Sequence, residues 1–459
     1  MKRSQINIII PILFAILSAN KAYSIAGQGE PLPLRAAAFS VDATPPVGGI
    51  TANTSVRKIE DRVSACGIIL LLPHDKPIVL CAVDAISIAN SGHDQWRMAL
   101  AEAAATTVER VAVHAVHQHD CPRYDFATEA MMAAHGCEGE FYDAKFGRDV
   151  ISRTAKAVQE AAKNARPVTH IGRGKAKVEK VASSRRFFID GKLKWRGSAC
   201  RDPNLIAATE GLIDPYVRMV SFWDGDEPLA CLMYYAVHPM SYYGKGDVTP
   251  DFVGLARNQR QKETGVLHIY FTGAAGDVAA GKYNDGAIHT RPILIGRMAA
   301  AMKQAWDSQQ KQAVEGMDIQ WRVQKISLPL AECLDEEYLK NKIAKTKDCN
   351  DRENMLDAAK LVWLTRTKKG EKIDLTCLKL GNSYILHMPG ELFIEYQLAA
   401  QAIRPDDMVC MAAYGQLGPW YIGTAKAYQE GGYEVSPQGT LAASSAESVL
   451  MEAMQGLLK

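Results

Sequence analysis

The sequence lacks the features that define several large classes of protein. It carries 53 Lys and Arg against 51 Asp and Glu, for a formal charge of +2. A balance so close to neutrality gives no electrostatic basis for binding nucleic acid or another polyanion. After its first residues the sequence has no apolar run of the length that a membrane-spanning helix needs, about 20 residues. The composition is that of a globular protein, with 47% hydrophobic and 23% charged residues.

Two common cofactor motifs are also missing. None of the ten cysteines forms a Cys-x-x-Cys pair, which disfavours a cysteine-rich zinc site. No glycine-rich segment ends in Gly-Lys-Ser/Thr, so a phosphate-binding P-loop is excluded. Five cysteines lie within apolar runs, as is typical of buried thiols: Cys66, Cys81, Cys231, Cys377 and Cys410. Cys121 and Cys137 flank a polar loop, and we predict that they pair in an oxidising compartment.

The N-terminus has the pattern of a secretory signal peptide. Lys2 and Arg3 precede an apolar run over residues 8–17, and Ala22-Tyr23-Ser24 follows as a small-x-small cleavage site. The alternative is a membrane anchor, for which the run is short. We predict removal of residues 1–24 and a secreted or periplasmic mature chain, residues 25–459. This removal would change the formal charge from +2 to −1, because residues 1–24 contain three basic and no acidic residues.

The remaining sequence alternates short apolar runs with amphipathic stretches. Strands are predicted over residues 67–72, 78–85, 108–116, 217–222, 229–237, 267–271, 375–380, 384–387 and 408–413. Helices are predicted over residues 94–105, 147–164, 290–312, 334–347, 352–367, 391–402 and 442–458. This alternation predicts an α/β fold with helices covering the strands, in a single large mixed domain. Residues 316–330 and 332–372 are interpreted as an elaboration that joins two halves of this domain.

The strongest chemical motif is His117-Gln118-His119. In a strand alternate residues share a face, which would align the following residues: Val111, Val113, Ala115, His117 and His119. Two imidazoles on one face at the end of a strand are typical of a metal site. The alternative is a pair of ordinary loop histidines. His114 has the opposite parity, and we interpret it as structural.

Two further strand ends carry possible metal ligands. His238 follows the apolar run that ends at Val237, although a lone histidine there is usually a core or capping residue. Glu391 follows a strand and a Pro-Gly turn, and is predicted to open a helix. Its carboxylate is therefore either a first-turn charge at the helix N-terminus or a metal ligand.

A small-residue loop follows the predicted strand 267–271. It consists of Gly273, Ala274, Ala275 and Gly276, where the backbone can approach a substrate closely. The N–H groups of such a loop can bind an oxyanion. The alternative is a tight, well-packed turn.

Together these segments resemble the neutral/alkaline non-lysosomal ceramidase family, in its N-terminal catalytic domain. Residues 41–48, Val-Asp-Ala-Thr-Pro-Pro-Val-Gly, are similar to the opening D-I-T-P-P-x-G of the family. Residues 117–122, His-Gln-His-Asp-Cys-Pro, are similar to its H-T-H-S-G-P motif. Residues 237–239, 389–391 and 420–422 resemble its other ligand segments. The resemblance covers most of the mature chain.

The resemblance implies a zinc ion and a set of ligands. The implied ligands are His117, His238, Glu391 and Tyr421, an N/O shell that suits zinc. His119 matches a histidine that lies beside the metal in the substrate site of the family. The implied fold is that of the catalytic domain, without the C-terminal β-domain of true ceramidases.

The sequence departs from the family pattern at informative positions. Ala279 stands where the family has a catalytic serine, in the segment 276–281. The family's T-T-P-E-E-Y stretch is reduced to Gly-Thr-Ala-Lys-Ala-Tyr over residues 423–428. The resemblance therefore does not carry ceramide over as the substrate, but the implied metal ligands are unaffected.

From these residues we predict a zinc-dependent hydrolase acting on an amide bond of an N-acylated lipid or a related N-acyl compound. His119 and Asp277 are the expected catalytic residues: His119 to transfer protons, and Asp277 or Asp120 to orient an imidazole. The loop 273–276 would bind the oxyanion. The alternatives are a metal-dependent hydrolase of another bond, in a glycan or cell-wall fragment, and a non-catalytic binding protein with the same fold.

Two arginines precede a pair of phenylalanines in the middle of the chain. Arg185 and Arg186 are interpreted either as contacts for an anionic or sugar-like substrate or as a solvated basic turn.

Overall fold

A computed structural model of the chain describes residues 33–459, except for 53, 243, 346–347 and 350. The predicted signal peptide, residues 1–24, lies outside the described residues. Residues Pro33–Lys459 form one unit by their internal contacts. Within this part of the chain, no helix is long and apolar enough to cross a membrane.

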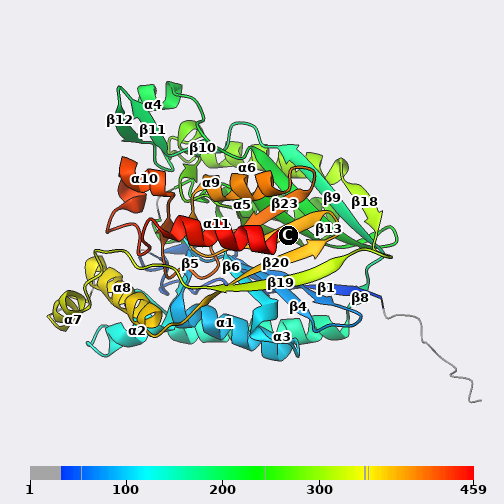
Figure 1. The fold of residues 1–459 in the computed structure, drawn as a ribbon, viewed down its shortest axis with the longest axis horizontal. Helices are drawn as coiled ribbons and strands as arrows, with labels where there is room; N and C mark the ends of the chain where they lie inside the picture. The colour runs from blue at the N-terminus through cyan, green and yellow to red at the C-terminus, as the bar shows by residue number, and fades with distance from the viewer. Residues whose placement is uncertain (1–32, 53, 243, 346–347, 350) are drawn as a thin grey trace, which may run out of the picture. The chain divides into compact units, whose positions relative to one another are not determined.

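The first of three main sheets has the strand order β6-β4-β3-β1-β8 (Figure 1). Its strands are β1 (Arg35–Asp42), β3 (Ser64–Leu71), β4 (Ile78–Val83), β6 (Val111–Ala115) and β8 (Arg166–Pro167). Every residue of β4 and β6 is buried, which explains their continuous apolar sequences. Helices α1 (Asn90–Ala103) and α3 (Ala144–Lys163) pack on this sheet. Asp143 caps α3, because its carboxylate accepts a hydrogen bond from the N–H of Phe146.

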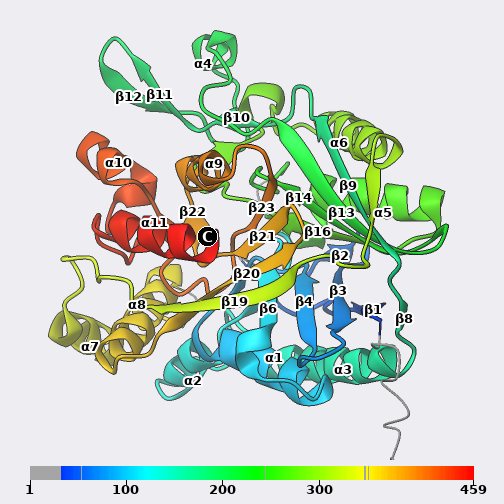
Figure 2. The ribbon, with the colours of Figure 1, turned by 45° about the vertical axis from the view of Figure 1, so that its right-hand side comes forward.

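The second sheet has the order β16-β14-β13-β9-β18. Its strands are β9 (His170–Lys177), β13 (Tyr216–Asp224), β14 (Glu227–Tyr235), β16 (His268–Thr272) and β18 (Gln310–Ala313). Helices α5 (Asp251–Thr264) and α6 (Thr290–Asp307) pack against each other and on this sheet (Figure 2). Side chains of the first two sheets belong to one continuous hydrophobic core.

The third sheet has the order β19-β20-β21-β23. Its strands are β19 (Ile319–Ile326), β20 (Ile373–Leu380), β21 (Ser383–His387) and β23 (Met408–Ala412), with α9 (Ile394–Ile403) and α11 (Ala446–Leu457) packed on them. β19 is a full edge strand, so the interpretation of residues 316–330 as a joining elaboration was wrong. Residues 332–372 hold α7 (Glu336–Ala344) and α8 (Arg352–Lys368), which pack on each other.

Short elements connect the three sheets and surround the site described below. The two-stranded pairs are β2 (Lys58–Ile59) with β15 (Asp247–Val248), β5 (Ser87–Ile88) with β7 (Arg123–Tyr124), β10 (Ser183–Ser184) with β17 (Val278–Ala279), β11 (Arg186–Ile189) with β12 (Lys192–Trp195), and β22 (Glu391–Leu392) with β24 (Tyr421–Ile422). The short helices are α2 (Phe126–Ala133), α4 (Pro203–Ala207) and α10 (Ala425–Glu430). Figures 1 and 2 show the β11–β12 hairpin and α4 set apart from the main sheets. The predicted mixed α/β class is confirmed.

The disulfide differs from the predicted one. Cys137 pairs with Cys349, 212 residues away in sequence, and Cys121 is a free, buried cysteine. The predicted Cys121–Cys137 pair was wrong because α2 carries Cys137 away from the loop of Cys121 and against α8. The bond therefore fastens the chain just before α8 to the end of α2. The five cysteines predicted to be buried thiols are all buried and free.

Candidate metal centre

His117 lies just beyond a strand rather than on it. β6 ends at Ala115, and His117 adopts a left-handed backbone conformation with φ +78°. Such a conformation is costly for a residue with a side chain, and it is found most often at functional sites. The strand-face alignment predicted for His117 and His119 was therefore wrong, although the structure does bring their rings together, with centroids 5.1 Å apart.

The ring of His117 has a fixed orientation. Its Nδ1 lies 2.6 Å from the carbonyl oxygen of Ile86, to which an Nδ1–H donates. This bond leaves the lone pair on Nε2, which is the arrangement of a metal-binding histidine held by a backbone carbonyl. His114, on β6 itself, instead faces the carbonyl of Ala413 through Nδ1, at 2.7 Å.

Two more histidines complete a cluster with His117. His238 comes three residues after the end of β14, a strand of the second sheet. Its Nε2 lies 2.9 Å from Nε2 of His119. One ring nitrogen from each of His117, His119 and His238 lies within 4.8 Å of the others. The sequence thus identified three residues that the structure brings together from two different sheets.

Glu391 adds a carboxylate to the three imidazoles. Its Oε2 lies 3.2 Å from Nε2 of His117 and 3.9 Å from Nδ1 of His238. Glu391 belongs to β22, and the following helix, α9, begins at Ile394. The prediction that Glu391 opens a helix was wrong, and its carboxylate is not a first-turn helix charge.

Tyr421 lies beside Glu391 because β22 and β24 pair in parallel with these two residues in register. The turn before Glu391 requires glycine: Gly390 has φ +65°, and a Cβ there would lie 2.9 Å from the carbonyl oxygen of Trp420. The Tyr421 hydroxyl is 3.2 Å from Nη1 of Arg185. Burial raises the pKa of Tyr421 well above its usual range, although Arg185 opposes the shift.

Three buried atoms at the centre of this cluster have no hydrogen-bond partner: Nε2 of His117, Nδ1 of His238 and Oε2 of Glu391. Leaving a buried polar atom unpaired costs about 1–3 kcal/mol. The two nitrogens lie 3.2 and 3.9 Å from the carboxylate oxygen, and nitrogen and carboxylate lone pairs together are the donor set of a divalent cation such as zinc. The residues present therefore fit a bound metal.

The imidazoles of His119 and His238 are held in their neutral form. Burial lowers the pKa of both well below the usual value, and the charge of Arg185 adds to the shift. A neutral imidazole is the form that binds a metal or accepts a proton. His119 is also the least buried of the three histidines, and so is best placed to meet a ligand from outside.

Most N–H groups of the small-residue loop 273–276 are already hydrogen-bonded within the protein. Its N–H groups at Gly273, Ala274 and Gly276 already donate to Tyr235, Gln397 and Leu392, at 2.9, 3.1 and 2.8 Å. A Cβ on Gly276 would lie 2.4 Å from the carbonyl oxygen of Glu391. The loop therefore packs directly against the backbone of Glu391, and only the N–H of Ala275 is left for an oxyanion.

The two aspartates named as orienting groups contact backbone rather than imidazole. Oδ1 of Asp277 accepts from the N–H of Ile394 at 2.8 Å, at the start of α9. Oδ1 of Asp120 accepts from the N–H groups of Lys245 and Gly246. Both carboxylates thus hold loops around the cluster.

Arg185 and Arg186 are buried rather than solvated. Their side chains are 5% and 8% exposed, and each lies 3.4 Å from the fully buried carboxylate of Glu434. Arg185 also donates to the carbonyl of Gly276, at 3.0 Å. The interpretation as a solvated basic turn was therefore wrong, and contact with a substrate stays a prediction.

Ala279 is fully buried in β17, opposite Ser183. The hydroxyl of Ser183 donates to the carbonyl oxygen of Ala279, at 3.0 Å. The side chain at position 279 therefore supplies no hydroxyl, and the neighbouring serine uses its own within the β10–β17 pair.

Tyr414 is a site residue that the sequence analysis missed. It follows β23 with φ +62°, and its ring lies 4.5 Å from that of His117 at an angle of 31°. Its hydroxyl is buried without a hydrogen-bond partner. The missed signal was its position, because Tyr414 follows a strand just as His117 and His238 do.

Comparisons with known proteins reveal similarity in fold alone. No protein-family model and no curated protein sequence matches the chain. The fold is similar to that of neutral ceramidase from Pseudomonas aeruginosa, with a TM-score of 0.69 and 15% identity over 94% of this chain and 74% of that one. A second ceramidase structure, complexed with C2, gives a TM-score of 0.68 and 16% identity over 93% and 75% of the two chains. The chain thus has the fold of the neutral ceramidases.

Proposed function

We propose that this chain is a zinc-dependent hydrolase that cleaves an amide bond in an N-acylated lipid or a related N-acyl compound. The observation that carries the proposal is the convergence of three unpartnered, buried donor atoms from His117, His238 and Glu391. The similarity in fold to neutral ceramidases supports amide hydrolysis as the reaction class. The N-terminal pattern of residues 1–24 supports export of the protein.

His117, His238 and Glu391 would hold the zinc ion, with Tyr421 beside Glu391 as the fourth proposed ligand. When bound, zinc would acidify a water molecule and polarise the substrate carbonyl. His119 is neutral and is the least buried of the three histidines, so it can take up a proton beside the metal site. Asp277 and Asp120 act, in this proposal, by holding the loops of the site.

The hydroxyl of Tyr414 is a better candidate than the loop 273–276 for binding the developing oxyanion. It is buried, unpartnered and stacked beside His117, whereas most N–H groups of the loop are already in use. Replacing Tyr414 with phenylalanine would remove one donor and retain the ring. We expect kcat to fall by about 10²-fold, as for the loss of one oxyanion donor elsewhere.

This Tyr414→Phe effect should appear with an unchanged zinc content, since the hydroxyl is not among the proposed ligands. Tyr428→Phe is the matched control, because that hydroxyl bonds to the backbone of Ala442 away from the cluster. An unchanged kcat in the Tyr414 variant would show that the hydroxyl takes no part in the reaction.

The proposed function is tested by metal analysis and a substrate panel. We expect about one zinc ion per chain, and hydrolysis of N-acyl amides that stops on dialysis against a chelator and returns with zinc. A zinc-loaded protein that cleaves glycosides or cell-wall fragments, but no N-acyl amide, would favour a metal-dependent hydrolase of another bond. A protein that binds no metal and turns over no compound would favour a non-catalytic binding protein.

A further inference from the structure

Two arginines near His119 have no carboxylate partner. Arg123 lies in β7, four residues after His119, and Arg352 is the first residue of α8. Within the described part of the chain, neither guanidinium forms an ion pair, and Arg352 forms no hydrogen bond either. β7 pairs with β5 so that Arg123 lies opposite Ser87, next to Ile86, whose carbonyl oxygen holds the ring of His117. Arg123 therefore lies beside the segment that carries His117 and His119.

Arg123 is a half-buried cation that forms no ion pair with a carboxylate among the described residues, although its guanidinium lies 5.8 Å from the centre of the Tyr142 ring. Its Nη2 donates to the carbonyl of Ala52 at 2.6 Å, its Nη1 faces the sulfur of Met355 at 3.2 Å, and its buried Nε has no partner. The carboxylate of Asp125 is already engaged by Asn90 and Thr128. Burying a charge without a counter-charge is costly, so a bound anion would stabilise this arrangement.

Arg352 lies in the first turn of α8, the turn whose Met355 contacts Arg123. The Cys137–Cys349 disulfide fastens the chain three residues before Arg352. The Arg123–Met355 contact places the first turn of α8 against β7. The side chain of Arg352 is exposed, so it can reach a ligand that enters from solvent.

The other carboxylates near the site are already in use. Oε2 of Glu391 faces His117 and His238, and Glu434 is enclosed by Arg185, Arg186 and the indole N–H of Trp195. Asp351 caps α8 by accepting from the N–H of Glu353. None of these groups neutralises Arg123 or Arg352.

We infer that Arg123 and Arg352 form an anion-binding subsite beside His119, and that the natural N-acyl substrate carries a negatively charged group close to its scissile amide. A guanidinium pair binds carboxylate, sulfonate or phosphate through charge-assisted hydrogen bonds. An N-acylated amino acid has such a group two bonds from the amide nitrogen. This inference rests on the proposed amide hydrolysis for its substrate class.

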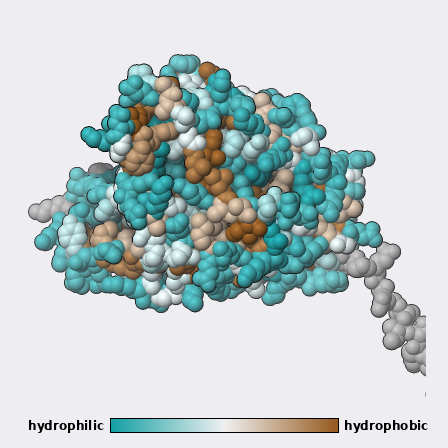
Figure 3. Space-filling view, turned by 45° about the horizontal axis from the view of Figure 1, so that its top comes forward, coloured by the Kyte–Doolittle hydropathy of each residue, from teal (hydrophilic) through white to brown (hydrophobic). Residues whose placement is uncertain are grey.

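Some exposed hydrophobic side chains lie near Tyr421. They are Tyr433, whose ring is 5.9 Å from that of Tyr421, and Phe188 and Trp195 on the β11–β12 hairpin. Figure 3 shows that, on the face drawn, hydrophobic side chains form separate patches within a largely hydrophilic surface. An acyl chain that contacts Tyr433 would lie beside Tyr421.

The test uses the full-length zinc-loaded protein and three compounds with one acyl chain: N-octanoylglycine, N-octanoyltaurine and N-octanoylethanolamine. The first two carry a carboxylate and a sulfonate, and the third is neutral. For Arg352→Gln we expect kcat/KM to fall by about 10- to 100-fold for the anionic compounds and to stay within about twofold for the neutral one. Arg352→Lys should keep part of the preference, because it retains the charge.

Arg62→Gln is the matched control, because Arg62 is an exposed arginine that pairs with Asp42, the last residue of β1. Measuring the binding of the same compounds by calorimetry distinguishes the anion-binding subsite from the proposed hydrolase activity. Anionic compounds that bind with dependence on Arg352 but are never cleaved would overturn the hydrolase proposal and support the subsite. Equal cleavage of all three compounds, unaffected by Arg352→Gln, would overturn the subsite alone. Compounds that neither bind nor react would overturn both.

Discussion

Replacing His117 with alanine is expected to abolish zinc binding and to reduce turnover by at least about 10³-fold, since the metal site supplies the reactive water. His117 contributes one of three unpartnered donor atoms at the centre of the cluster, and its Nδ1 bond to Ile86 fixes the direction of that donor. No neighbouring side chain can substitute for it, because His119 already faces His238. Metal content per chain and turnover of an N-acyl amide measure the two effects.

The protein should still fold without the imidazole of His117. The backbone N–H of His117 bonds to the carbonyl of Ala85 at 2.8 Å, and alanine retains this bond. His289→Ala is the control for loss of an imidazole, since the side chain of His289 is 73% exposed. A His117→Ala protein with a normal melting temperature, full zinc occupancy and full activity would refute the metal centre.

The sequence predicted which residues meet better than it predicted how they meet. His117, His238 and Glu391 each follow an apolar run, and strand ends from neighbouring sheets gather at one place. The expectation that alternate residues share a face failed at His117, because β6 ends two residues earlier and the backbone turns left-handed. Such a turn depends on the bond from His117 to Ala85, a contact that local sequence does not encode.

Long-range contacts explain the other errors. The loop 273–276 appeared free for a ligand, but its N–H groups bond to Gln397 and Leu392, over a hundred residues later. Cys137 has its partner 212 residues away. Tyr414 was missed because a tyrosine after a strand is ordinarily a core residue, and its unpartnered hydroxyl becomes visible only in three dimensions.

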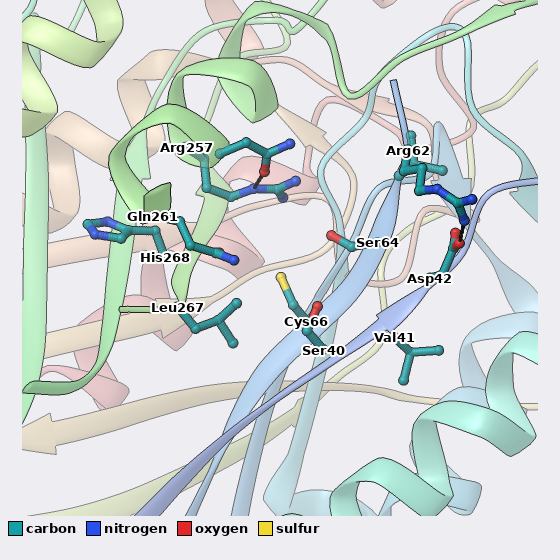
Figure 4. A pocket seen from close by; sticks show the side chains of 12 residues that line it. Ser40, Val41, Asp42, Arg62, Ser64, Cys66, Arg257, Gln261, Leu267 and His268 are labelled. Carbon is teal, nitrogen blue, oxygen red and sulfur yellow. Dashed lines mark hydrogen bonds and ion pairs between the residues drawn. The ribbon is translucent and has the colours of Figure 1, made fainter. Parts of the chain in front are cut away.

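A buried ionic network contacts Gln118, between two residues of the proposed metal centre. Asp84 is fully buried and accepts two hydrogen bonds from Arg257, both at 3.0 Å, and one from the side chain of Gln118 at 2.7 Å. Gln118 separates His117 and His119 in sequence, so the network fixes the segment that carries both. Arg257 and Ser64 also line a pocket of about 240 Å³ (Figure 4).

The charge of Arg257 depends on Asp84. Burial by itself would lower the pKa of Arg257, but the carboxylate of Asp84 outweighs it and the pKa is raised. Asp84 also accepts from the backbone and the hydroxyl of Ser64, at 2.8 and 3.0 Å. A neutral residue at position 84 would therefore leave a buried cation without its counter-charge.

Replacing Asp84 with asparagine should lower the free energy of unfolding by about 3–5 kcal/mol, the usual cost of removing one partner of a buried ion pair. Asparagine keeps the size of the side chain, so the loss reports charge rather than a cavity. Urea unfolding measures it, with Asp42→Asn as the control, because the Asp42–Arg62 pair is exposed and contributes at most about 1 kcal/mol. Zinc affinity should fall as well, since asparagine has one acceptor oxygen in place of the two that Asp84 offers to Gln118, Arg257 and Ser64.

The double variant Asp84→Asn/Arg257→Met distinguishes the lost ion pair from general damage to the core. Removing both charges eliminates the unpaired buried cation, and we expect it to recover part of the stability lost in the single variant. The metal centre should not recover, because Gln118 still lacks the carboxylate that holds it. A single variant as stable as the parent, or a double variant whose losses simply add, would show that Asp84 and Arg257 do not act as a pair.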